Sequence, residues 1–464
     1  RQQLFQCRVF VGFLAICAVA VMSASTRGIL QEKNMATMGS HESSTFSELT
    51  SDGSFRHEDD TSDDDTTFAP EDEMTLQRVT MNEFGARCLD GSEVSYYFRK
   101  GFGAGSNKWM IFLEGGGWCV TLKECYEWAI LGTSVGSSLY QDNSTSQLRG
   151  IHSVDEGVNP TFFNWNHVYV NYCDGGSYSG YRSEPLTEFG EEVFFHGKYV
   201  VPSVLTDLTS SQGLVNATDL VFGGESSGAL GAMLNANSVV TFMKRGIGSK
   251  ASVRIISDAG WFVQMPDHAG ENYNSDWFSG VALTHNVTGH LNTECLEKHA
   301  EDSWRCMLPN YNYPYISAPL FIIQSSLDIY QLEYFYFHDE DEGIACVKDP
   351  MRNCTQDLFA STEDFRKKLL KNLELPLKTP TTGMFVDACW AHVQTKSNSH
   401  FNNPKVQSTA MVDVISAWYN LPDSSSGRIK IVDNSDWPHA NQICDDDLDW
   451  ESWLNRSGNF AVQA

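Results

Sequence analysis

A serine in a tight glycine turn, Ser226, is the residue of this chain best suited to nucleophilic chemistry. It lies in the sequence GGESSG at 223–228, after the apolar run 219–222 and before an Ala-, Leu- and Met-rich segment, 229–244. Strand, turn and helix are therefore predicted in that order. A serine hydroxyl becomes nucleophilic when such a turn exposes it, a base takes its proton and backbone N–H groups receive the oxyanion. The pattern predicts a nucleophile elbow, although glycine and serine turns without chemistry are common.

A carboxylate downstream of the serine is the second chemical group. Asp328 follows the β-prone run 320–324 after a short turn, at the carboxyl end of a predicted strand, where α/β proteins build their sites. Its place after Ser226 fits the chain order serine, acid, histidine of the α/β-hydrolases. We expect Asp328 to be the acid of a triad, and capping of the following segment is its alternative role.

The histidine of this order is His392. It lies in a loop after the apolar residues 383–386 and near Cys389, which is able to fix the loop. A lone histidine in a loop is usually a surface or packing residue, but His392 lies downstream of both other groups. We therefore favour His392 over His400 and His439 as the general base.

A glycine-rich loop offers the backbone N–H groups that an oxyanion needs. The sequence LEGGGWC at 113–119 directly follows the β-prone run 109–113. We expect Gly116 and Gly117 to donate two N–H groups and Ser227 to donate a third. No Lys-Ser/Thr follows the glycines, so a phosphate-binding P-loop is not predicted. The residues predicted to line the substrate pocket are apolar: Trp118, Phe262, Met307 and Leu308.

Apolar strands alternating with helices must position these groups. Strands are predicted at 109–113, 167–172, 219–222, 253–257 and 320–324. Helices are predicted at 229–244, 361–372 and 408–419. This alternation indicates the α/β class, with a mostly parallel sheet covered on both faces. Because neither an internal repeat nor a second change in composition occurs, we expect one large domain over 74–464.

The acidic composition excludes several partners. The chain of 464 residues has 59 Asp and Glu against 32 Lys and Arg, a formal net charge of −27. Such a charge does not attract nucleic acid or an anionic membrane. Much of the excess lies in EDDTSDDD at 58–65, within the polar segment 26–73, which we interpret as a disordered acidic linker. The sequence has neither EF-hand spacing nor C-x-x-C pairs, so no metal is expected.

The first 25 residues have the pattern of a secretion signal. Arg8 precedes an apolar run, 9–22, and the small residues 23–25 follow, which is typical of a signal peptide rather than a full membrane span. An uncleaved signal anchor is the alternative. Five glycosylation sequons agree with a secreted, extracellular protein: Asn143, Asn216, Asn286, Asn353 and Asn455.

Ten cysteines follow the leader, an even number that predicts disulfides in a secreted chain. Six of them form pairs close in sequence that suggest local loop staples: Cys119 with Cys125, Cys295 with Cys306, and Cys346 with Cys354. The other four are Cys88, Cys173, Cys389 and Cys444.

From about Thr75 to Cys444 the chain closely resembles the pectin acetylesterase/Notum family of secreted serine esterases. Six ordered runs carry the resemblance: LDGSEVSYYFRKGFGAGSNKWMIFLEGGGWC, FFNWNHVYVNYCDGGSYSG, GGESSGALG, SDAGWF, SLDIYQLE and DACWAHVQ. The resemblance implies an α/β-hydrolase fold, a triad of Ser226, Asp328 and His392, and no cofactor. It also implies the disulfides Cys88–Cys173, Cys119–Cys125, Cys295–Cys306, Cys346–Cys354 and Cys389–Cys444.

The elbow departs from the family pattern G-x-S-A-G-G at two positions. Ser227 replaces the usual alanine and still supplies its N–H group. Glu225 places a carboxylate beside the nucleophile, where it either points into solvent or changes the local field and disfavours an anionic substrate. Nothing in the sequence decides between these two roles of Glu225.

The resemblance offers two kinds of ester substrate. KGFGAGSNKW, FFNWNHVYVNYCDG, ACVKDPMRNC and SAWYN look more like the plant-type members, whereas DWPH at 436–439 looks more like Notum. We therefore expect a carboxylesterase that removes O-acetyl groups from a pectin-like polysaccharide. Removal of a fatty acyl group from a secreted, Wnt-like protein is the alternative, and an inactive secreted binding protein is the third.

Overall fold

A computed structural model of the chain describes residues 73–130, 132, 134–145, 149–422, 429–434 and 444. The chain divides after residue 52 into two units, and all described residues lie in the second. The predicted leader over 1–25, nearly all of the predicted linker, Asn455 and His439 therefore lie outside the described residues. Within them, no helix is long and apolar enough to cross a membrane.

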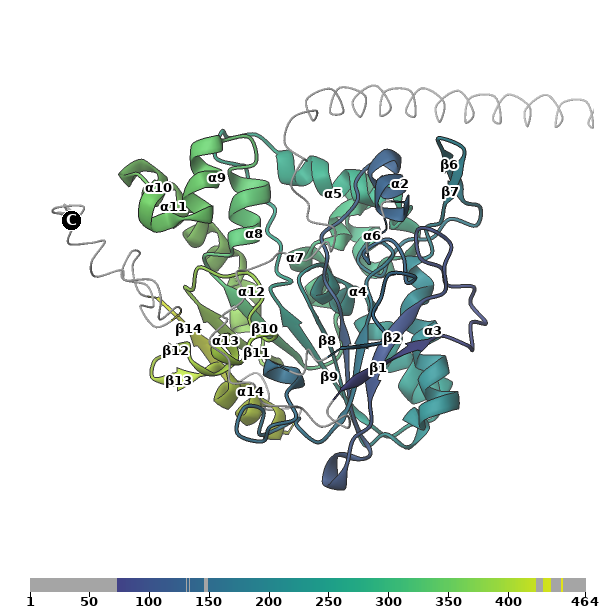
Figure 1. Cartoon of the computed structure of the whole chain (residues 1–464). Coiled ribbons are helices and arrows are strands. Elements are labelled where there is room, and N and C mark those ends of the chain that lie inside the picture. Colours follow the sequence, from purple (N-terminus) through teal and green to yellow (C-terminus); the bar gives the residue numbers. More distant parts are fainter. Residues whose placement is uncertain are drawn as a thin grey trace, which may run out of the picture. The chain divides into compact units, whose positions relative to one another are not determined.

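The described residues form a ten-stranded sheet, which runs through the middle of Figure 1. Its order is β14-β11-β10-β9-β8-β3-β5-β2-β1-β4. Neighbours from β14 to β5 pair in parallel, and the edge formed by β2, β1 and β4 is antiparallel. The strands are β1 Met74–Arg78, β2 Ser95–Arg99, β3 Lys108–Leu113, β4 Ser144–Thr145, β5 Asn166–Val170, β8 Asp219–Glu225, β9 Ser252–Asp258, β10 Leu320–Ser325, β11 Thr382–Asp387 and β14 Lys430–Val432.

Two short hairpins lie outside this sheet, and helices connect the strands. The hairpins are β6 Leu186–Glu188 with β7 Glu191–Val193, and β12 Lys405–Val406 with β13 Thr409–Ala410. The helices are α2 Leu122–Ile130, α3 Val200–Asp207, α4 Ser227–Thr241, α5 Tyr273–Thr284, α6 Thr293–Lys298, α7 Pro309–Asn312, α8 Ile329–Gln331, α9 Asp341–Lys348, α10 Pro350–Asn353, α11 Gln356–Asn372, α12 Glu374–Lys378, α13 Asn398–Asn402 and α14 Met411–Asn420.

The side chains of the central strands alternate between two hydrophobic cores. In β3, Trp109 and Ile111 join the core that contains α3 and α4, whereas Met110 and Phe112 join the core that contains α14. Successive residues of a strand point to opposite faces of the sheet, so a strand buried on both faces reads as a continuous apolar run. The predicted mostly parallel sheet with both faces covered is confirmed.

The predicted strands correspond to β3, β5, β8, β9 and β10, with shifted ends. β8 continues through the glycines to Glu225, because it pairs with β9 up to Asp258. The helix predicted at 408–419 begins later, at Met411, because Ser408 has a positive φ of 64° and 409–410 pair in β13. The helix predicted at 361–372 begins earlier, at Gln356, where the Thr355 side chain caps it.

Five disulfides join the ten cysteines in the pairing that the resemblance implied: Cys88–Cys173, Cys119–Cys125, Cys295–Cys306, Cys346–Cys354 and Cys389–Cys444. The Cys119–Cys125 bond follows the glycine loop, and Cys389–Cys444 fixes the loop that carries His392. The four sequon asparagines that the structure describes, Asn143, Asn216, Asn286 and Asn353, are all exposed.

Candidate active site

Ser226 lies at the sharp turn between β8 and α4. Its backbone has a φ of 54° and a ψ of −128°, a conformation that costs free energy for a residue with a side chain and is typical of a nucleophile elbow. Glycines make the turn possible: a Cβ on Gly224 would lie 2.5 Å from the backbone of Gly228, and one on Gly228 would lie 2.2 Å from the carbonyl oxygen of Leu113. The Ser226 N–H donates to the Asp258 carbonyl oxygen over 2.8 Å, which holds the turn against β9.

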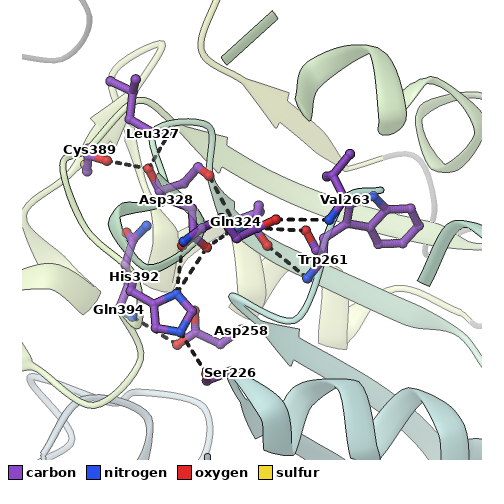
Figure 2. A network of polar contacts seen from close by, with 12 residues as sticks. Ser226, Asp258, Trp261, Val263, Gln324, Leu327, Asp328, Cys389, His392 and Gln394 are labelled. Atoms are coloured by element: carbon purple, nitrogen blue, oxygen red, sulfur yellow. Dashed lines mark hydrogen bonds and ion pairs between the residues drawn. The ribbon is translucent and has the colours of Figure 1, made fainter. Parts of the chain in front are cut away.

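Figure 2 shows His392 between Asp328 and Ser226. His392 Nε2 lies 2.7 Å from Ser226 Oγ, and His392 Nδ1 lies 3.0 and 3.1 Å from the two carboxylate oxygens of Asp328. These distances join the candidate nucleophile, base and orienting acid in one hydrogen-bonded chain, the arrangement that a catalytic triad requires. Ser226 and Asp328 are buried, and the His392 side chain is 15% exposed. The structure thus brings together the three residues that the sequence placed in order.

Asp328 has two roles at once. It accepts a hydrogen bond from the Gln331 N–H over 3.1 Å and so caps α8, the alternative role considered from the sequence. It also accepts one from Gln324 Nε2 over 2.7 Å, and Gln324 in turn accepts from the Trp261 N–H. Because these donors fix the fully buried carboxylate, it can hold the imidazole ring of His392 in one orientation.

The glycine loop follows β3 and lies directly against the elbow. A Cβ on Gly115 would lie 2.7 Å from the Cβ of Ser226, so only glycine allows this approach. Ser227 is the first residue of α4, where N–H groups lack an intrahelical acceptor. The Gly116 N–H, in contrast, donates to Ser227 Oγ over 2.9 Å. Of the three predicted oxyanion donors, Gly116 thus has an acceptor within the structure, and Ser227 offers its N–H at the start of α4.

Aromatic side chains surround the apolar side of this site. We call Trp118, Phe262, Phe278, Tyr330 and Phe335 the aromatic group. Trp118 lies with its ring centroid 4.8 Å from that of Phe262 and 5.0 Å from that of Phe278. The Tyr330 ring stacks on His392 at 4.9 Å, with 22° between the planes. Trp118 and Phe262, two of the predicted pocket residues, thus lie next to the catalytic candidates.

The other two predicted pocket residues, Met307 and Leu308, are fully buried in the main core, and the contacts of Ser226, Asp328 and His392 described above do not include them. Sequence reasoning missed Tyr330 instead. The available signal was its position two residues after Asp328, but its contact with His392 depends on how α8 turns after that residue.

Ionisable side chains adjoin the site through Glu225. We call Glu114, Tyr169, Glu225 and Lys396 the charged group. The Glu225 side chain is 3% exposed, and its Oε1 accepts from Tyr169 Oη over 2.5 Å, from Lys396 Nζ over 3.2 Å and from the Gly115 N–H over 3.3 Å. Glu225 therefore points inward, and its suggested exposure to solvent is wrong.

The loop 388–397 carries His392, and we call it the histidine loop. It is anchored on β9. Asp258 Oδ2 accepts hydrogen bonds from the Gln394 N–H over 3.0 Å, from the Thr395 N–H over 2.8 Å and from Thr395 Oγ1 over 2.7 Å. Burial raises the pKa of Asp258 to about 6, although these donors oppose the shift. The next residue, Lys396, reaches Glu225, so β8 and β9 both hold the histidine loop.

Burial also shifts the ionisation of the charged group. It raises the pKa of Glu114 to about 7, and the charge of Lys396 opposes this rise. For Lys396, burial lowers the pKa, but the negative charges of Glu225 and Glu114 more than offset burial and leave the pKa raised. Lys396 therefore keeps its positive charge beside two carboxyl groups.

Two further candidates are the alternative histidine, His400, and a possible metal site. His400 belongs to α13, whereas His392 makes the contacts with Ser226 and Asp328. Among the described residues, a metal-like arrangement of ligand atoms occurs at Cys119, Cys125 and His285, but the two sulfurs are joined in a disulfide. That disulfide leaves no pair of thiolates there to bind a metal.

Three comparisons place this chain among known proteins. The pectinacetylesterase (PAE) family profile matches residues 68–445. Pectin acetylesterase 7 of Arabidopsis thaliana is 32% identical over 341 residues, which cover 72% of this chain and 84% of the relative. The palmitoleoyl-protein carboxylesterase notum2 of Xenopus laevis is 27% identical over 380 residues, 77% of this chain and 71% of the relative.

A solved structure shows the same fold. The Wnt deacylase Notum from Drosophila superposes with a TM-score of 0.68 and covers 80% of this chain and 100% of the Notum chain, at 23% identity. The predicted α/β-hydrolase architecture, with its mostly parallel sheet and disulfides, is confirmed.

Proposed function

The chain belongs to the pectinacetylesterase family and is a carboxylic ester hydrolase, and we propose that it is a secreted serine esterase that removes O-acetyl groups from a pectin-like polysaccharide. The observation that carries the proposal is the hydrogen-bonded chain Ser226–His392–Asp328 at a strained elbow. Its elements occur in the order that α/β-hydrolases use.

The proposed reaction follows from this geometry. His392 takes the proton of Ser226 Oγ as the oxygen attacks the ester carbonyl, and Asp328 stabilises the imidazolium that forms. The N–H groups of Gly117 and Ser227 receive the oxyanion. His392 then protonates the departing alcohol, and a water molecule, deprotonated by the same histidine, hydrolyses the acyl-enzyme. No step of this reaction calls for a metal or an organic cofactor.

Secretion and the domain limits belong to the same proposal. Five disulfides are typical of an oxidising, extracellular compartment. The exposed sequons support glycosylation of an extracellular protein. We assign the esterase to a single domain over 74–464, after the leader and the acidic linker.

Tyr330 favours a short acyl group. Its hydroxyl oxygen lies 3.1 Å from the position that a Cβ on Gly117 would take, and its ring covers one face of His392. Tyr330 therefore occupies space next to Gly117, where Trp118 and Phe262 also pack against it. An acetyl methyl group needs little room there, whereas a long acyl chain would have to displace the tyrosine ring.

Hydrolysis of matched chromogenic esters tests the proposal. Purified full chain should hydrolyse 4-nitrophenyl acetate and release acetate from acetylated pectin, and Ser226→Ala should lose activity by at least about 10,000-fold. The exposed Ser210→Ala is the matched control and should keep the wild-type rate. Full activity of Ser226→Ala, or no activity of the wild type, would contradict the assignment; an inactive wild type would favour a binding protein of the same fold.

The acyl-chain profile separates the two ester substrates. The match to notum2 over 77% of the chain keeps a fatty-acyl protein substrate as the second candidate. A large preference for 4-nitrophenyl octanoate over the acetate would establish that candidate and reject the acetyl proposal.

A further inference from the structure

We propose that Glu225 and Lys396 form a positioning pair that fixes the glycine loop, 113–119, and the histidine loop relative to Ser226. The inference rests on the proposed function of Ser226 and His392. It concerns Glu225, which stands next to the nucleophile and which the triad mechanism does not use.

The position of Glu225 makes it a junction of three segments. It is the last residue of β8 and directly precedes Ser226, so its backbone is part of the elbow. Its Oε1 accepts from the N–H of Gly115, at the start of the glycine loop. The same oxygen accepts from Nζ of Lys396, four residues after His392. One carboxylate oxygen therefore contacts the glycine loop and the histidine loop.

Tyr169 of β5 completes the junction. Its hydroxyl donates to Glu225 Oε1 over 2.5 Å and accepts from Lys396 Nζ over 2.8 Å. The Lys396 ammonium also lies 5.2 Å from the centroid of the Tyr169 ring, within range of a cation–π interaction. The lysine is thus held on two sides while its side chain remains 36% exposed.

Charge explains why the two residues depend on each other. A carboxylate that is 3% exposed is costly unless a cation and hydrogen-bond donors compensate it. Without Lys396, the buried Glu225 carboxylate would lose its cationic partner, and its bond with the Gly115 N–H would weaken as the side chain turns away. We therefore expect loss of Lys396 to move the glycine loop as well as the histidine loop.

Steady-state kinetics of Lys396→Met and Lys396→Arg tests the pair. For 4-nitrophenyl acetate, we expect Lys396→Met to lower kcat about 10- to 100-fold, because small displacements of catalytic groups have effects of this size. KM should stay within about threefold, and Lys396→Arg, which keeps the charge and the donors, should recover most of kcat. Lys348→Met, which removes the ion pair of the exposed Lys348 with the half-buried Glu333, is the matched control and should change neither constant.

Titration of Ser226 with a fluorophosphonate separates positioning from folding. We expect kcat per titrated serine to fall in Lys396→Met, because the folded enzyme itself is slower. An unchanged kcat per titrated serine, or equal losses in the methionine and arginine variants, would overturn the inference. An inactive wild type would instead overturn the proposed function, so the two failures are distinguishable.

Discussion

The aromatic group and the charged group both adjoin Ser226 and His392, but their members depend on one another differently. The rings of Trp118, Phe262 and Phe335 pack against one another at centroid distances between 4.8 and 6.4 Å, and the hydrogen bond of Trp118 Nε1 goes to Ser177 Oγ, outside the group. In the charged group, three donors converge on one oxygen of Glu225. A packed ring tolerates a similar apolar side chain, whereas loss of one ion partner leaves the other uncompensated. We infer that substrate preference can vary at the aromatic group, while the charged group keeps the catalytic geometry constant.

The largest loss of activity is expected at Asp328, which belongs to neither group. Asp328→Asn keeps the shape of the side chain but removes the charge that orients His392, and we expect kcat for 4-nitrophenyl acetate to fall about 10,000-fold. Steady-state kinetics measures this loss. The exposed Asp339→Asn is the control and should keep the wild-type rate. A loss of less than tenfold would show that Asp328 acts only as the cap of α8.

Stability should separate the two groups next. Lys396→Met strands the Glu225 carboxylate, and we expect the free energy of unfolding to fall by about 2 kcal/mol, less than for a fully buried pair because Lys396 is partly exposed. Tyr330→Phe keeps the packed ring and should cost about 1 kcal/mol or less. Urea titration followed by tryptophan fluorescence measures both values. The reverse order would break the comparison between the groups.

The pH dependence of stability probes the charged group through Glu114. Its pKa is about 7 in the folded chain against an ordinary value of 4.5, so the folded state holds a proton that the unfolded state releases. The stabilisation from Glu114 is therefore complete below about pH 4.5 and is lost as the pH rises through 7. Glu114→Gln imitates the protonated form at every pH.

We accordingly expect the free energy of unfolding of Glu114→Gln, relative to that of the wild type, to rise by about 1 to 2 kcal/mol as the pH goes from 5 to 8. The variant is compared with the wild type because other groups also make the stability depend on pH. Burial lowers the pKa of His152 and His285, so the stabilisation from these two histidines rises with pH, opposite to that from Glu114. Urea titrations across this pH range measure the difference. A constant difference would show that Glu114 does not titrate in this range.

The triad candidates could be located from the sequence because each depends on local pattern and chain order. Ser226 follows a strand and precedes a helix, Asp328 follows a strand after a short turn, and His392 lies downstream of both. The sheet and its alternating helices were predictable for the same reason, since continuous apolar runs mark strands buried on both faces. Strands, helices and the order of the candidate residues can all be recognised from neighbouring residues, so no knowledge of distant contacts is needed.

The charged group could not be predicted because its members come from four separate segments. Glu225 and Lys396 are 171 residues apart, Tyr169 lies in β5, and Glu114 directly follows β3. Only the parallel order of the strands brings these ends together. The aromatic group shows the same limit: Trp118 and Phe262 were predicted to line the pocket, but Tyr330 was not, because its place depends on how α8 turns after Asp328.

The smallest expected effect concerns Tyr330 and decides whether the aromatic group sets acyl length. Tyr330→Leu removes the ring beside Gly117 and keeps an apolar side chain, so we expect the ratio of kcat/KM for 4-nitrophenyl octanoate to that for the acetate to rise about tenfold, which corresponds to about 1.4 kcal/mol. Tyr330→Phe should leave the ratio within about threefold of the wild type, because it removes only the hydroxyl group and keeps the ring that covers His392. Tyr334→Leu changes a neighbouring ring, 4.7 Å from Tyr330, and is the matched control. An unchanged ratio in Tyr330→Leu would show that the acyl chain lies elsewhere, and the two groups would then differ only in stability.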